Sequence, residues 1–85
     1  MDRLINEWLF KLGLNSAFIT NKIKRWNVLE YRQCIQWKLY YEHNYSTPEI
    51  ARYFEQVPTT VRHGVLKIQS MKETDSKIKD ILSKF

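Results

Sequence analysis

Two neighbouring residues in the second half of the chain, Arg62 and His63, could contact the edges of DNA bases. They stand in the stretch PEIARYFEQVPTTVRHGVLKI, residues 48–68, where apolar residues recur at Val61, Val65 and Ile68. In a helix this spacing forms one buried stripe and turns Arg62 and His63 away from it. An arginine on such a face can bond a guanine edge through two hydrogen bonds. The alternative is an ordinary solvated helix face, and we favour base contact.

A second group of residues could hold the sugar–phosphate backbone. The stretch NKIKRW contains Lys22, Lys24 and Arg25, whose positive charges would position the protein on phosphates. Ser46 and Thr47 precede a predicted helix, where hydroxyls cap the first turn and a phosphate can bind. A solvated surface is the alternative for the three basic residues, and capping alone is the alternative for the two hydroxyls.

The size of the chain leaves room for one domain with its function on the surface. Its 85 residues, of which 44% are hydrophobic, can build one small core, and we expect a single domain over residues 1–85. The two histidines, His43 and His63, have no carboxylates at metal-ligand spacing, and the two glycines cannot build a phosphate-binding loop. We therefore expect no enzyme, no cofactor and no bound metal.

Charge and cysteine content indicate an intracellular protein with a negatively charged partner. The net charge is +5, and the excess lies in two blocks, residues 19–32 and 56–72. If these blocks meet in space, they would form the basic surface expected of a nucleic-acid binder. The single cysteine, Cys34, excludes an internal disulfide, and no apolar run is long enough for a membrane span. We expect a cytoplasmic protein that does not enter membranes, with a monomer favoured.

Helical patterns run through nearly the whole chain. Apolar spacing close to the helical period, with capping residues between the segments, predicts six helices and no strand. We expect capping pairs at Asn27 with Glu30 and at Ser46 with Glu49, and Gly13 is placed to close the first helix. The expected helices cover residues 2–12, 15 or 16 to 23, 28–43, 48–54, 58 onward and 75 or 76 to 85, which gives an all-α bundle.

The helices predicted at residues 48–54 and from 58 onward have the spacing of a helix-turn-helix. Ala51 is a small residue where two steeply crossed helices would meet, and Phe54 and Val61 would fill the angle between them. Pro58 disfavours helical geometry at the residue before it, so the chain must turn there. This turn commonly holds a glycine where the chain has Glu55. A glutamate must adopt an ordinary conformation there or accept about 1 kcal/mol of left-handed strain.

A series of short motifs runs in order from about residue 19 onward. They are NKIKRW, RQ at residues 32–33, SxxEIAxxF at 46–54, TTV at 59–61, His63, and KI at 67–68. In this order they resemble the C-terminal DNA-binding domain of the bacterial replication initiator DnaA, here as a stand-alone domain. The resemblance covers most of the chain and implies a helical fold of the Trp-repressor type.

The resemblance also implies a partner and a role. Duplex DNA would be bound by the helix that begins at Pro58, in a protein that regulates replication or transcription. The threonine pair would approach bases in the major groove, and the basic loop, residues 22–26, would reach phosphates or the adjacent minor groove. Taken together, the predicted base contacts are Thr59, Thr60, Arg62 and His63, and the predicted backbone contacts are Lys22, Lys24, Arg25, Arg32, Ser46, Thr47 and Lys67.

One part of the chain departs from the family pattern. Before the threonine pair the family carries an Asp-His pair that reads bases, whereas this chain has Val57 and Pro58 in a turn that is one residue shorter. These apolar residues favour an alternative function. The chain would then be a protein-interaction module of the same fold that has lost base reading and docks on a replication or transcription protein.

Overall fold

The computed structural model describes the backbone of residues 1–14 and 26–85 and the side chains of residues 1–14 and 29–85. Within these ranges it is all-helical and has no strand, which confirms the all-α part of the prediction. About six helices were predicted and the described part contains five; the predicted helix from residue 15 or 16 to 23 lies outside the described residues. The five are α1 (Asp2–Leu12), α3 (Trp26–Tyr41), α4 (Thr47–Phe54), α5 (Pro58–Met71) and α6 (Ser76–Ser83).

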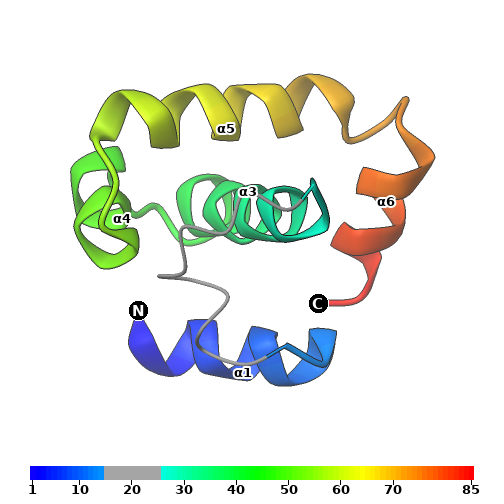
Figure 1. Ribbon diagram of the computed structural model, residues 1–85, viewed down its shortest axis with the longest axis horizontal. Coiled ribbons are helices and arrows are strands. Elements are labelled where there is room, and N and C mark those ends of the chain that lie inside the picture. The colour runs from blue at the N-terminus through cyan, green and yellow to red at the C-terminus, as the bar shows by residue number, and fades with distance from the viewer. Residues whose placement is uncertain (15–25) are drawn as a thin grey trace.

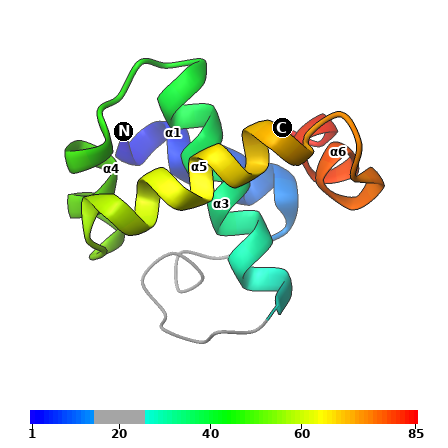
Figure 2. The ribbon, with the colours of Figure 1, turned by 90° about the horizontal axis from the view of Figure 1, so that it is seen from above.

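Helix α3 lies at the centre of the molecule and the other helices surround it. In Figure 1, α5 passes above α3, α1 lies beneath it, and α4 and α6 lie at its two sides. Figure 2 shows α5 crossing α3 at a steep angle. Four consecutive residues of α3, from Cys34 to Trp37, are all buried. Consecutive positions point in different directions around a helix, so the middle of α3 is covered on every side.

The core is built from one apolar face of each outer helix packed on α3. In α5 the predicted stripe is confirmed, because Val61, Val65 and Ile68 are buried together with Gly64. Each of the outer helices therefore presents a single buried face, as expected of amphipathic helices around a central one. The buried apolar residues are Ile5, Trp8, Leu9, Cys34, Ile35, Trp37, Leu39, Ile50, Ala51, Phe54, Val61, Val65, Ile68, Ile78 and Ile81.

Predicted capping residues define the end of α1 and the starts of α4 and α6. The Ser46 hydroxyl accepts a hydrogen bond from the Glu49 N–H and donates one to the Glu49 carboxylate, which confirms the second capping pair. The Asp75 carboxylate caps α6, and Gly13 closes α1 in the left-handed conformation with φ of 71°. The capping pair predicted at Asn27 is wrong, because α3 already begins at Trp26 and the backbone of Asn27 is inside its first turn.

The end of α3 also differs from the prediction. The helix stops at Tyr41 instead of continuing to His43. Asn44 adopts a left-handed conformation with φ of 59°, and the Tyr45 N–H donates to the Leu39 carbonyl, which closes the helix. Asparagine tolerates this conformation better than most residues, so the break is encoded locally.

Aromatic packing joins the two ends of the described chain. The Trp8 ring lies between His43 and Phe85, with centroid separations of 5.3 and 5.5 Å. The Lys38 ammonium lies 4.6 Å from the centroid of the Phe85 ring and donates to the Phe85 carbonyl oxygen. A cation over an aromatic ring is attracted by its negative face, so Lys38 holds the C-terminal residue against α3.

Helix α1 has a further polar attachment to α4. The Tyr53 hydroxyl donates to the Asp2 carboxylate over 2.5 Å. Burial and this hydrogen bond raise the pKa of Tyr53 to about 12.

None of the helices described is both long and apolar enough to cross a bilayer.

The buried thiol of Cys34 provides a test of the core. Burial, and then the negative charge of Glu30, raise the pKa of Cys34 from 9.0 to about 12. Since the thiolate is the reactive form, we expect an aromatic disulfide reagent at pH 8 to react with native protein at least ~100-fold more slowly than with unfolded protein. Because the pKa of Cys34 is higher in the folded than in the unfolded protein, the protonated thiol contributes to the stability of the fold at pH values below the unfolded pKa. The stability that Cys34 contributes is lost as the pH rises from about 9 to about 12. Complete labelling of the native protein within seconds at pH 8 would contradict the described burial.

Gly64 provides a test of how closely α5 packs on α3. A Cβ added at Gly64 would lie 3.1 Å from Cγ and 3.3 Å from Nε2 of Gln33. Alanine favours a helix over glycine by about 1 kcal/mol, but here the gain is opposed by this contact. We expect Gly64→Ala to change the free energy of unfolding little in the natural sequence. In a Gln33→Ala background it should stabilise by about 1 kcal/mol, because the opposing side chain is gone. Equal effects in both backgrounds, measured by urea unfolding, would show that the two helices are not in contact here.

Candidate nucleic-acid interface

Helices α4 and α5 meet through a tight connection at residues 55–57. Ala51 and Phe54 of α4 are buried against α5, where Ala51 supplies the small residue that the sequence predicted at this crossing. Glu55 adopts the left-handed conformation with φ of 55° and ψ of 43°, which is the strained one of the two predicted possibilities. The Gln56 N–H then donates to the Ala51 carbonyl over 2.9 Å and closes α4. The chain therefore reverses within the connection and starts α5 at Pro58.

The predicted base contacts all lie on the solvent side of α5. Thr59, Thr60, Arg62 and His63 are exposed in the first two turns, where Thr59 and His63 lie opposite the buried stripe and Thr60 and Arg62 lie on its two flanks. Helix α5 itself lies on the outer margin of the molecule, with no other described element outside it (Figure 1). Their exposure is as predicted, and base contact itself stays a prediction.

The predicted backbone contacts occupy several environments. Lys67 is exposed on α5, whereas Arg32 is half-buried on α3, where burial lowers the pKa of its guanidinium. Ser46 is exposed, but both of its hydroxyl interactions are made with Glu49, so capping is its observed role. Thr47 is half-buried in the first turn of α4. The remaining predicted contacts, Lys22, Lys24 and Arg25, lie outside the described residues, as does the side chain of Trp26.

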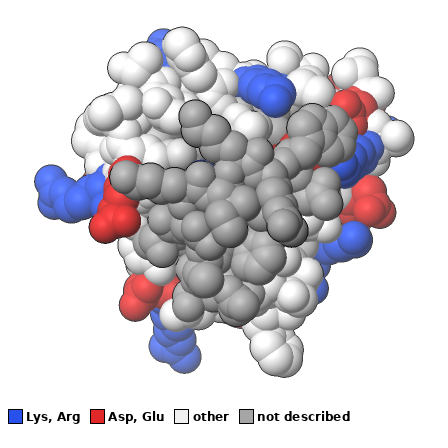
Figure 3. Space-filling model, in the orientation of Figure 1, with Lys and Arg blue, Asp and Glu red and all other residues white. Residues whose placement is uncertain are grey.

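The charge pattern of α5 favours an anionic partner. No carboxylate occurs between Pro58 and Met71, while Arg62 and Lys67 are both exposed. In Figure 3 the upper left margin, over α5, shows mostly white atoms with some blue and no red, whereas red and blue atoms lie together lower on the left and along the right side. A face with positive charge and no negative charge attracts phosphates at long range.

The exposed side chains of this face can form hydrogen bonds and ion pairs. Among residues 1–14 and 29–85 no group of three or more His, Cys, Asp or Glu side chains could hold a metal ion. Hydroxyl, imidazole, guanidinium and ammonium groups on one helix face are the donors and acceptors that proteins use toward bases and phosphates.

Sequence reasoning missed two features that bear on this interface. A buried hydrogen bond from Gln36 Nε2 to Gln56 Oε1, 2.7 Å long, ties α3 to the connection before α5. The second feature is a small cavity of about 40 Å³ between α5, α3 and the start of α4. Its lining includes Tyr40 and Leu66, neither of which was predicted as a contact. The hydrogen-bond partner of a glutamine side chain cannot be predicted from sequence spacing. The close grouping of Tyr40, Tyr41 and Tyr45 near the end of α3, however, is apparent in the sequence and could have indicated a binding surface.

The strain at Glu55 provides a test of the connection. A non-glycine residue in the left-handed region loses about 1 to 2 kcal/mol, and glycine avoids this loss but adds about 0.5 to 1 kcal/mol of unfolded-state entropy. We therefore expect Glu55→Gly to raise the free energy of unfolding by about 0.5 to 1 kcal/mol. Asn44→Gly, at the other left-handed position, should gain less because asparagine tolerates this conformation. A loss of stability in Glu55→Gly, measured by thermal unfolding, would contradict the described turn.

Comparison with known proteins does not assign the chain to a family. No family model, no curated protein and no solved structure matches it.

Proposed function

We propose that the protein binds duplex DNA by inserting α5 into the major groove, with α4 and α5 acting as a helix-turn-helix. The observation that carries the proposal is the outer face of α5: it exposes four predicted base contacts, contains two cations and lacks any carboxylate. The major groove, about 12 Å wide, admits one helix. The resemblance to the C-terminal domain of DnaA supports the same function and favours a role in regulating replication or transcription.

The way α5 is held suits it to this role. Its buried stripe packs on α3, Gly64 allows close approach, and the closed turn at Glu55 fixes the direction in which α5 leaves α4. A rigid helix keeps its exposed side chains in a fixed arrangement, which base reading requires. The threonine pair and His63 lie in the first two turns and would face base edges, while Lys67 lies one turn further on and would meet the backbone.

A protein-interaction module is the second candidate function. Val57, at the start of α5, is 61% exposed, and Phe10 on α1 is 87% exposed. Exposed apolar side chains can contact an apolar protein surface but offer nothing to phosphates, so Val57, which replaces a charged residue of the family pattern, motivates this candidate. The two functions differ in their response to DNA, which makes them separable by experiment.

Binding to duplexes, measured by fluorescence anisotropy, tests the main proposal. A preferred duplex is first selected from a random pool and compared with an unselected one. If about five phosphates are neutralised, the logarithm of affinity should fall with the logarithm of salt at a slope of about −4 to −5. Replacing a base-reading residue, as in Thr59→Ala or His63→Ala, should lower affinity for the selected duplex about 5- to 100-fold and leave the unselected duplex unchanged. Lys67→Ala should weaken both duplexes and reduce the slope by about one.

Lys79 on α6 provides a matched control. It is exposed and lies on a helix at the other side of the molecule from α4, so Lys79→Ala removes one positive charge away from the proposed interface. We expect this variant to bind like the natural protein. Failure of the natural protein to bind any duplex at about 50 mM salt would overturn DNA binding and favour the interaction module.

A further inference from the structure

Two neighbouring hollows lie beside α5, and Tyr40 lines both of them. The smaller one is the cavity of about 40 Å³ between Tyr40, Thr47, Arg62 and Leu66. The larger one is an open hollow of about 360 Å³ at the bend between α3 and α4, lined by Tyr40, Tyr41, Asn44, Tyr45 and Ser46. Because they share Tyr40, the two hollows form one surface that runs from α5 across the start of α4.

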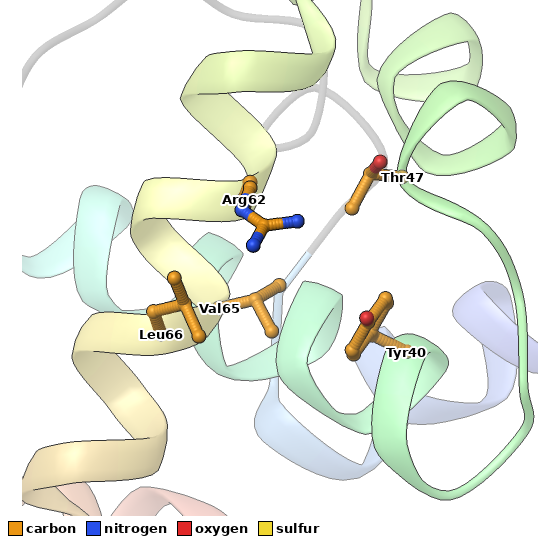
Figure 4. A pocket seen from close by; sticks show the side chains of 5 residues that line it. All are labelled: Tyr40, Thr47, Arg62, Val65 and Leu66. Atoms are coloured by element: carbon orange, nitrogen blue, oxygen red, sulfur yellow. The ribbon is translucent and has the colours of Figure 1, made fainter.

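Arg62 is directed into this surface. Figure 4 shows its guanidinium turned across the small cavity toward Thr47, with the Tyr40 ring below. Arg62 and Leu66 are one turn apart on α5 and lie on the same edge of the helix. The arginine therefore lies at the border between the face that we propose for the major groove and the tyrosine-lined hollow.

The residue types that line the two hollows suit a phosphodiester strand. Besides Val65 and Leu66 they are three tyrosines, an asparagine, a threonine, a serine and one arginine, and no lining residue carries a carboxylate. Neutral hydroxyl and amide donors together with arginine make up most of the contacts that proteins form with phosphate and sugar oxygens. An anionic strand is therefore the occupant that the chemistry favours.

Two of the three tyrosine rings are packed against aromatic neighbours. The Tyr41 ring meets the Tyr40 ring edge-on at 83°, with 4.9 Å between centroids, and also packs against the Trp37 ring at 5.7 Å. Stacking on a base requires a free ring face. The contacts between Tyr40, Tyr41 and Trp37 hold the two tyrosine rings in place and occupy part of their surface, so we assign the ligand contact to their hydroxyls.

We propose that this surface, defined by Arg62, Thr47, Tyr40, Tyr41, Asn44 and Tyr45, binds the sugar–phosphate backbone of one DNA strand beside the groove that α5 enters. The proposal rests on the proposed DNA binding of α5 and extends it. It assigns Arg62 to the backbone in place of the predicted base contact, and it adds the tyrosines as neutral backbone contacts. The strand would leave the major groove at Arg62 and cross the start of α4 toward Tyr45.

Salt dependence separates the two kinds of backbone contact. Arg62→Ala removes a charge that neutralises a phosphate, so it should weaken the selected and the unselected duplex alike, about tenfold, and reduce the salt slope by about one. The triple replacement of Tyr40, Tyr41 and Tyr45 by Phe keeps the rings and removes only the hydroxyls. It should also weaken both duplexes alike, about five- to tenfold, with the slope unchanged. Lys79→Ala is the control for loss of charge, and thermal unfolding of each variant checks the fold.

A second measurement uses the natural protein and removes a charge from the DNA instead. Methylphosphonate linkages, which are uncharged, are placed one at a time along each strand of the selected duplex. We expect a short run of positions on one strand at which the substitution weakens the natural protein but has a smaller effect on the triple Phe variant. Such non-additivity would show that the hydroxyls and those phosphates interact.

The outcomes distinguish this inference from the proposed function. If the natural protein binds no duplex, the proposed function fails and the inference with it. If the natural protein binds but the triple Phe variant binds equally well, the strand contact alone is overturned. An Arg62→Ala variant that loses preference for the selected duplex, with an unchanged slope, would show that Arg62 reads a base and would overturn its assignment to the backbone.

Discussion

The structure depends on the burial of α3 on every side. A helix that exposes one face can be covered by a single neighbour, but the buried run from Cys34 to Trp37 needs neighbours in several directions. The four other described helices supply them, each with one apolar face. This arrangement also explains why α3 carries a buried polar residue. Gln36 is 2% exposed and is satisfied by the side chain of Gln56, so the central helix is bonded directly to the connection that starts α5.

Helix α5 carries the proposed interface and is fixed in place by its contacts with the buried helix α3. Trp37 donates from its indole N–H to Gln69 over 2.8 Å, and Gly64 lies against Gln33, so α5 is held to α3 along its length. The left-handed turn at Glu55 sets its angle to α4. A helix that is already fixed at several points loses little conformational entropy when it binds a partner. The entropic cost of binding is therefore small, and more of the interaction free energy contributes to affinity.

Much of the fold could be predicted from the sequence because its signals are local. The bounds of α1, the capping pair at Ser46, the start of α5 at Pro58 and the buried stripe of α5 all follow from the spacing of neighbouring residues. The start of α3 was predicted wrongly, because Asn27, a residue type that often caps helices, has its backbone inside the helix. Neither the pairing of Gln36 with Gln56 nor the meeting of Arg62 and Tyr40 at one cavity could be predicted, because both depend on how helices pack. For the candidate site, the exposed face of α5 was predictable and its border with the tyrosine-lined surface was not.

The contact of Trp8 with Phe85 links the stability of the two ends of the described chain. Terminal helices usually fray independently, with opening free energies far below that of global unfolding. Here α1 cannot separate from α3 without uncovering Phe85, and Phe85 cannot leave without exposing one side of Trp8. We therefore expect the two ends to open as one cooperative unit, with coupled amide hydrogen exchange in α1 and α6, the first and the last of the described helices.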